Sequence, residues 1–183
     1  MPLSEFRVAA PATVSRNLAK TAVQIVVMWS TALYLGPVLL ATVQARLRLE
    51  FLDFVPLRRT GFALLVLFSL CGLWSGGVLV VHGHGTPLPL DTARTLVIAG
   101  PYRHIRNPMA LTGVGQALSV GMMLGSFAVL TYALVGGLLW NYVLRPREEA
   151  NLERRFGEAY SEYRRDVPCW RVRRHPYRPV RRG

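Results

Sequence analysis

An uncharged run of 38 residues, from Asn107 to Leu144, constrains the fold of this chain most strongly. Runs of 18 or more apolar residues are typical of membrane-spanning segments. As a single helix this run would be about 57 Å long, whereas the hydrocarbon core of a bilayer is about 30 Å thick. The run must therefore fold back, and Gly125-Ser126 is the natural turn. The sequence predicts a tight helical hairpin with legs at 108–124 and 127–144.

Two further segments without charged residues, 21–43 and 60–81, have the length of membrane spans. The first is interpreted as a retained span rather than a cleaved signal peptide, because it lacks a clear small-residue exit. Gly36-Pro37 is expected to kink it. In the second, small residues allow close helix approach in lipid; they are Gly72, Ser75, Gly76 and Gly77. The chain is predicted to be an all-α integral membrane protein with about four transmembrane helices.

The net charge of +12 lies entirely outside the uncharged runs. A pI near 11.0 is common in nucleic-acid-binding proteins. Charge that flanks apolar runs instead indicates membrane orientation, so we expect no nucleic-acid partner. The positive-inside rule assigns the loop 82–106 and the Arg-rich segment 145–183 to the cytoplasm, and the loop 44–59, with a net +2, to the other side. The expected location is a bacterial inner membrane, with both termini and the active site facing the cytoplasm.

Two clusters of polar and aromatic residues flank the predicted hairpin. The first lies in an irregular, Gly- and Pro-rich segment that ends at Met109, and the second begins at Glu148-Glu149. Arg145-Pro146 is predicted to open an amphipathic helix, with one face formed by Glu149, Leu152, Phe156, Tyr160 and Tyr163. The hairpin returns the chain to the same side of the membrane. We therefore expect the two clusters to meet there in a cytoplasmic cofactor-binding segment.

The motifs in these clusters resemble those of the isoprenylcysteine carboxyl methyltransferase and phospholipid N-methyltransferase superfamily. The matching residues, in chain order, are Thr95-Leu96-Val97, Gly100-Pro101-Tyr102, Arg106-Asn107-Pro108-Met109, Glu148-Glu149, Phe156-Gly157, Tyr160, Tyr163 and Val167-Pro168. The resemblance covers roughly 82–170. It divides the chain into N-terminal transmembrane helices at 1–81, a methyltransferase core at 82–170 and a basic tail at 171–183.

The resemblance implies an S-adenosyl-L-methionine-dependent membrane enzyme that methylates a lipid-like or prenylated acceptor. It implies that one Glu of the pair binds the cofactor, together with Arg94, Thr95, Leu96, Val97, Tyr102, Asn107, Pro108, Met109 and Ala110, and that Arg145 faces the acceptor. Carboxylates suit the ribose hydroxyls and the ammonium group of this cofactor, and aromatic faces suit its sulfonium. The sulfonium already activates the methyl group, so direct in-line transfer needs positioning and no obligatory general base.

Because of two departures from the family pattern, the motifs do not identify the methyl acceptor. Asn107 stands where a His is usual, and Ala110 stands where a Tyr is common, which leaves a wider pocket. One hypothesis is a methyltransferase for an isoprenylcysteine-like carboxylate. A second is a methyltransferase for a phospholipid amine or a small thiol. A third is a non-catalytic membrane protein that keeps the fold as an interaction module.

Other polar residues have simpler interpretations. Glu148-Glu149 could merely satisfy the dipole at the start of a helix. Arg103 and Arg106 could anchor lipid headgroups at the interface. His82 and His84 form an H-x-H pair with no third ligand nearby, so we expect no metal. The tail at 171–183 is expected to be solvated or bound to lipid.

Overall fold

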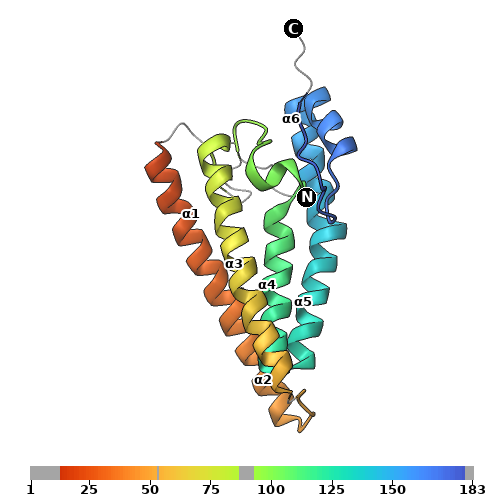
Figure 1. Ribbon diagram of the computed structural model, residues 1–183. Helices are drawn as coiled ribbons and strands as arrows, with labels where there is room; N and C mark the ends of the chain where they lie inside the picture. Colours follow the sequence, from red (N-terminus) through yellow and green to blue (C-terminus); the bar gives the residue numbers. More distant parts are fainter. Residues whose placement is uncertain (1–12, 53, 87–92, 180–183) are drawn as a thin grey trace, which may run out of the picture.

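The computed structural model describes residues 13–52, 54–86 and 93–179 as a bundle of helices (Figure 1). Within these residues no β-strand occurs, which confirms the predicted all-α class. The helices in chain order are α1 (Val14–Met28), the π-helical η1 (Trp29–Leu35), α2 (Gly36–Arg46), α3 (Val55–Gly83), the 3₁₀-helical η3 (Gly100–Arg103), α4 (Pro108–Leu124), α5 (Phe127–Leu139), the π-helical η4 (Trp140–Leu144) and α6 (Arg145–Asp166).

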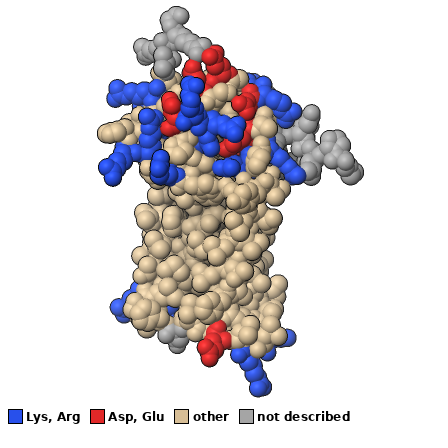
Figure 2. Space-filling view, turned by 90° about the vertical axis from the view of Figure 1, so that its right-hand side faces the viewer, with Lys and Arg blue, Asp and Glu red and all other residues tan. Residues whose placement is uncertain are grey.

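Three continuous helical rods in the described part of the chain are long and apolar enough to cross a membrane: Val14–Arg46, Val55–Gly83 and Phe127–Asp166. The fourth apolar helix, α4, has 17 residues and is about 26 Å long. Charged side chains gather at the two ends of the molecule, and the middle is apolar (Figure 2). These features confirm an integral membrane protein whose apolar helices enclose the predicted spans 21–43 and 60–81.

The predicted hairpin is present, with its turn at Gly125-Ser126. Gly125 has a φ of +60°, and Ser126 caps α5 by accepting a hydrogen bond from the Val129 N–H at 3.3 Å. The Leu52 N–H donates to the Gly125 carbonyl at 2.8 Å, so the loop after α2 lies against this turn. A side chain at Gly125 would collide with the Leu52 carbonyl oxygen. We call this end of the bundle, formed by residues 44–52, 54 and 125–128, the turn end.

The close contact between α3 and α4 depends on small residues, as the sequence predicted, although the closest approach is elsewhere. A Cβ atom added at Gly61 would lie 2.8 Å from the Ser119 carbonyl oxygen, so any side chain there would push the helices apart. At Gly72 the added atom would lie 3.2 Å from the Thr112 hydroxyl, whereas at Gly77 nothing lies within 4 Å. Gly61 therefore sets the helix spacing more than the predicted stripe does.

Each of two prolines, Pro37 and Pro146, follows a π-helical segment. The Gly36 N–H donates to the Thr31 carbonyl, and the Arg145 N–H donates to the Trp140 carbonyl, both to the fifth preceding residue. Proline lacks an N–H and clashes with the carbonyl four residues before it, and a wider turn relieves that clash. The helix therefore continues through both prolines. Arg145-Pro146 opens α6, as expected, and α6 also continues the rod formed by α5 and η4.

Helix α6 is folded back on itself at Gly157, which has φ +54° and ψ −129°. Only glycine adopts this conformation readily. Twelve of the 22 residues of α6 are charged, so this helix lies beyond the apolar belt. The single amphipathic helix expected there is thus two arms. Its predicted apolar face still gathers, because Leu152 and Phe156 of the first arm pack against Tyr160 and Tyr163 of the second.

The segment after α6 runs along the loop that precedes α4. The Arg106 N–H donates to the Pro168 carbonyl at 3.0 Å, and the Tyr177 N–H donates to the Arg103 carbonyl at 2.8 Å. Tyr177 is buried, whereas the arginines of the segment are mostly exposed: Arg171, Arg174 and Arg178. The expected solvated tail is therefore docked over its described part. We call this end of the bundle, formed by residues 93–107 and 145–177, the head.

Candidate cofactor and acceptor site

A cavity of about 480 Å³ lies between the head and the first turns of α4. Volumes of about 300–1,000 Å³ are usual for small-molecule sites. Residues from both motif clusters line it, which confirms that the hairpin brings the two clusters together. Its wall also includes residues of the spanning helices, namely Met28, Leu79, Gly113, Val114, Trp140 and Leu144.

Most of the predicted site residues line this cavity: Thr95, Leu96, Val97, Tyr102, Asn107, Met109, Ala110, Arg145, Glu148 and Glu149. Two others do not. The side chain of Arg94 is exposed, and its N–H donates to the Gly83 carbonyl at 2.6 Å. Pro108 is buried at the first position of α4, where a missing N–H costs nothing. The side chains of Arg94 and Pro108 therefore do not line the cavity. Their contacts with a cofactor stay predictions.

Tyr102 is held in the cavity wall by its backbone. The short helix η3 begins at Gly100, whose φ of +50° suits glycine, and Tyr102 itself is buried. The Tyr163 hydroxyl, from the folded-back arm of α6, donates to the Tyr102 carbonyl at 2.6 Å. Burial raises the pKa of the Tyr102 phenol above its ordinary value, so this ring stays neutral. It can serve as an apolar wall with a hydrogen-bonding tip.

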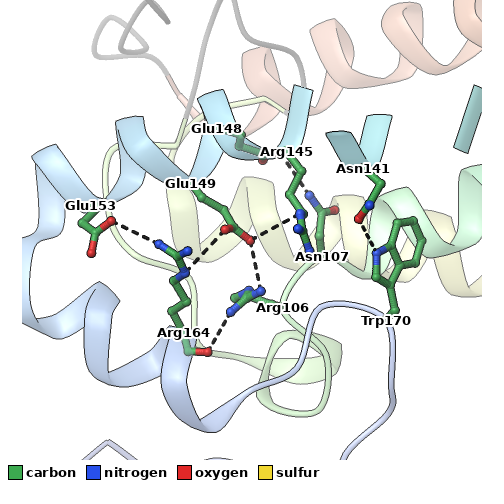
Figure 3. A network of polar contacts seen from close by, with 9 residues as sticks. All are labelled: Arg106, Asn107, Asn141, Arg145, Glu148, Glu149, Glu153, Arg164 and Trp170. Atoms are coloured by element: carbon green, nitrogen blue, oxygen red, sulfur yellow. Dashed lines mark hydrogen bonds and ion pairs between the residues drawn. The ribbon is translucent and has the colours of Figure 1, made fainter. Parts of the chain in front are cut away.

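Asn107 links the start of α4 to the acidic pair on α6 (Figure 3). Its Oδ1 accepts from the Ala110 N–H at 3.0 Å and thereby caps α4, while its Nδ2 donates to Glu148 Oε2 at 3.1 Å. One side chain therefore caps α4 and contacts the acidic pair.

Glu149 is the centre of a cluster of arginines (Figure 3). Its carboxylate lies 3.0 Å from Arg106 Nη2, 3.5 Å from Arg164 Nε and 4.0 Å from Arg145 Nε. Arg106 also donates to the Arg164 carbonyl at 2.7 Å. Glu149 and Arg106 are both largely buried, with side chains 11% and 12% exposed. Glu149 therefore joins the first arm of α6, the second arm and the loop before α4.

The two glutamates differ in their electrostatic surroundings. Burial raises the pKa of Glu148 to about 7, with a further contribution from the charge of Glu149, whereas the hydrogen bond from Asn107 lowers it. Glu148 therefore gains and loses its charge near neutral pH. Glu149, by contrast, has its charge balanced by the three arginines around it. Glu148 is consequently the carboxyl group available to a ligand.

Several residues of the cavity wall were not among the predicted site residues. One of them is Arg106, which was considered as a possible anchor for lipid headgroups. Its Nε atom is buried without a hydrogen-bond partner, and so is the Nε atom of Arg145. A buried glutamate needs a charged partner, so the sequence could indicate that an arginine lies near the acidic pair, but not which arginine. Further examples come from α6 and the docked segment: Asn151, Leu152, Arg155, Tyr160, Tyr163 and Cys169.

His82 and His84 lie outside the cavity wall and are exposed at the end of α3. Thr95 Oγ1 donates to the His82 carbonyl at 2.5 Å, so this turn supports the site through its backbone. No group of three or more His, Cys, Asp and Glu side chains able to hold a metal occurs among residues 13–52, 54–86 and 93–179. That no metal is required stays a prediction. Residues 87–92 of the Gly- and Pro-rich segment fall outside the described residues.

Comparison with known proteins gives one match. Neither the curated proteins nor the solved structures contain a significant match to this chain. The family model described as phospholipid methyltransferase matches residues 57–159, which is more than half of the chain. This stretch includes α3, the loop with Tyr102 and Asn107, the hairpin and the acidic pair. The chain therefore belongs to the phospholipid methyltransferase family.

Proposed function

We propose that the protein transfers a methyl group from S-adenosyl-L-methionine to a lipid-like acceptor within the membrane. The observation that carries this proposal is the single cavity that both motif clusters line and that extends from the charged head to the apolar helices. Membership in a methyltransferase family supports the reaction class. The cavity supports the pairing of a polar cofactor with an apolar acceptor.

The residues of the cavity fit the cofactor. Glu148 and the Tyr102 ring would hold its cationic groups and its adenosyl group, with Asn107 orienting Glu148 through their hydrogen bond. The buried Nε atom of Arg106 lacks a hydrogen-bond partner and is a donor for the carboxylate of the cofactor. When bound, the cofactor supplies a methyl group already activated by a sulfonium. The protein then has to align the acceptor and exclude water.

The acceptor would approach from the lipid, between α1 and η4. Met28 of α1 and Leu144 of η4 line the cavity and are 48% and 51% exposed. An opening between these two helices would connect the cavity with the lipid. Arg145 follows Leu144 directly in the sequence and lines the same cavity. An anionic group such as a carboxylate would be held there and would need no general base.

The test is to incubate the purified protein in lipid nanodiscs, with added membrane lipids, with methyl-labelled cofactor and to identify the labelled product. Alkali releases labelled methanol from a carboxyl methyl ester but not from a methylated amine or thiol. A base-labile product supports an isoprenylcysteine-like carboxylate, and a stable product supports the phospholipid amine or the small thiol. Cofactor binding without any product, or no binding at all, supports the non-catalytic alternative and contradicts the proposal.

A matched pair of variants links the reaction to the cavity. Glu148→Gln removes the carboxylate that lines the cavity, whereas Glu153→Gln changes an exposed carboxylate of the same helix. We expect the first variant to lose labelling and the second to keep it. Equal labelling by both variants would place the site elsewhere.

We further propose that the head faces the cytoplasm. The described start of α1 and the docked segment lie at the head, and the turn end lies opposite (Figure 1). Both ends carry arginines, with more at the head (Figure 2). Reporter fusions after Glu50 and after Gly183 should report opposite sides of the membrane, with Gly183 inside. The same side for both fusions would refute this orientation.

A further inference from the structure

A second, smaller cavity of about 60 Å³ lies further along α4 from the head, between α1, α3 and α4. Its lining includes three residues that also line the main cavity: Met28, Met109 and Gly113. The two cavities are therefore neighbours that share a wall. Polar residues contribute to the smaller one although it lies among the spanning helices; they are Gln24, Thr112 and Gln116.

Gly113 is the smallest of the shared residues and lies at the boundary between the two cavities. A Cβ atom added at Gly113 would meet nothing within 4 Å. This differs from Gly115, two residues later, where the added atom would lie 2.7 Å from the Phe68 ring. Gly115 is thus required for helix packing, whereas packing does not require a glycine at 113. The residue at this position instead borders both cavities.

Gln24 is the polar residue of the smaller cavity that lacks a full set of partners. Its Nε2 donates to Thr86 Oγ1 at 3.2 Å, but its Oε1 is buried without a hydrogen-bond partner in the described structure. By contrast, the Thr112 hydroxyl donates to the Met109 carbonyl at 3.0 Å within its own helix. A buried acceptor left without a donor costs about 1–3 kcal/mol, so a ligand that supplies one is favoured.

We infer that the acceptor extends past Gly113 into the smaller cavity and places a hydrogen-bond donor, a hydroxyl or N–H group, on Gln24 Oε1. This inference rests on the proposed function, because it defines the acceptor of that site. The volume equals about two water molecules, which limits the inserted group to a short end or branch. The acceptor class is therefore an apolar molecule with a small donor group separate from its methyl-accepting atom.

The experiment uses a photoreactive long-chain alcohol and its methyl ether, which differ only in the donor. Each probe is cross-linked to the whole protein in nanodiscs without cofactor, and labelled peptides around residues 24–29 and 109–116 are quantified. We expect the alcohol to label roughly fivefold more than the ether. Gln24→Leu should bring this ratio close to one. Thr112→Val, a change in the same cavity wall, should leave the ratio as in the wild type.

A second pair of variants tests the passage. Gly113→Leu should abolish labelling around residues 24–29, whereas Gly136→Leu, which also enters open space but on the lipid face of α5, should not. Equal labelling by alcohol and ether in the wild type, or a ratio unchanged by Gln24→Leu, would overturn the inference and leave two water molecules as the occupants.

Cofactor binding, measured by calorimetry on each variant, separates the two proposals. Retained binding also shows that Gln24→Leu is folded. Thermal unfolding serves this purpose for Gly113→Leu, because Gly113 itself lines the main cavity. If the alcohol preference depends on Gln24 but the wild type binds no cofactor, the proposed function fails. The smaller cavity is then still a site that binds a hydrogen-bond donor. If the cofactor binds and the preference is absent, only the inference fails.

Discussion

The two ends of the bundle are both polar, but their polar groups are satisfied differently. At the turn end, Gln44 accepts from Ser126 Oγ at 2.5 Å and from the Ala128 N–H at 3.1 Å, and it donates to the Glu50 carbonyl at 2.7 Å. At the head, Arg106 and Arg145 each keep a buried Nε atom without a hydrogen-bond partner, and both residues line a cavity.

This difference separates structure from function. A buried polar network with every partner supplied holds helices together and specifies their register. A network with unpaired atoms around a cavity is costly to the protein alone and suits a ligand that completes it. Changes at the turn end should therefore affect stability only, whereas changes at the head should affect stability or ligand binding according to the residue.

The largest effect is expected from Glu149→Ala. The change leaves Arg106 buried without its ion pair, and breaking a buried pair in this way costs about 3–5 kcal/mol. Glu153→Ala removes an exposed pair with Arg164 and should cost less than about 1 kcal/mol. Thermal unfolding of both variants in the same detergent measures the difference. Similar unfolding temperatures would show that the arginine cluster does not hold the head together.

Gln44→Ala comes next, at about 2–3 kcal/mol, because it leaves more than one buried partner unsatisfied at the turn end. The dissociation constant for S-adenosyl-L-methionine should stay as in the wild type. Thr42→Ala is the control, because the Thr42 hydroxyl donates only to the Val38 carbonyl of its own helix in an exposed position. Weaker cofactor binding by Gln44→Ala would contradict the expectation that changes at the turn end affect stability only.

Glycine substitutions compare the two ends directly. Gly157→Ala should cost about 1–2 kcal/mol from backbone strain alone, since no atom lies within 4 Å of the added Cβ. Gly125→Ala should cost more, because the added atom also collides with the Leu52 carbonyl. Gly136→Ala, in a helical and open position, is the control and should be neutral or stabilising. Denaturant unfolding in which Gly157→Ala costs more than Gly125→Ala would contradict the expected order.

The smallest effect is the pH dependence of cofactor binding. Glu148 has its pKa raised to about 7, so it is mostly neutral below pH 7 and mostly anionic above it. A cationic ligand favours the anionic form, and the affinity should rise by up to tenfold per pH unit, about 1.4 kcal/mol, until it levels off above pH 7. Calorimetry between pH 5.5 and 7.5 measures the slope. Glu148→Gln should bind weakly with no slope, and a slope that persists would assign it to another group.

The sequence predicted the hairpin and the meeting of the two clusters because both follow from strong local signals. An uncharged run too long for one span must turn, and Gly125-Ser126 was the turn available. The motifs around Tyr102, Asn107 and Glu148 indicated which residues would line the cavity. Their contacts with a cofactor stay predictions.

Other features could not be predicted because they depend on contacts between residues far apart in the sequence, or on which backbone conformation a single glycine adopts. A lone glycine in a helical pattern is usually tolerated, so Gly157 gave no sign that α6 folds back. The pairing of Arg106 with Glu149 spans the whole hairpin. The division of roles between Glu148 and Glu149 follows from that pairing and not from their neighbouring positions in the sequence.

The docked segment after α6 has a consequence for the order in which the protein is made. Chains emerge from the ribosome at about 5–20 residues per second, N-terminal parts first. The apolar helices precede Pro168, Cys169 and Tyr177 in the chain, so they leave the ribosome first. Pro168 and Tyr177 contact the loop before α4, and Cys169 lines the cavity. The site is thus unfinished until the last part of the chain has been made, and its ligands can bind only after translation has passed this segment.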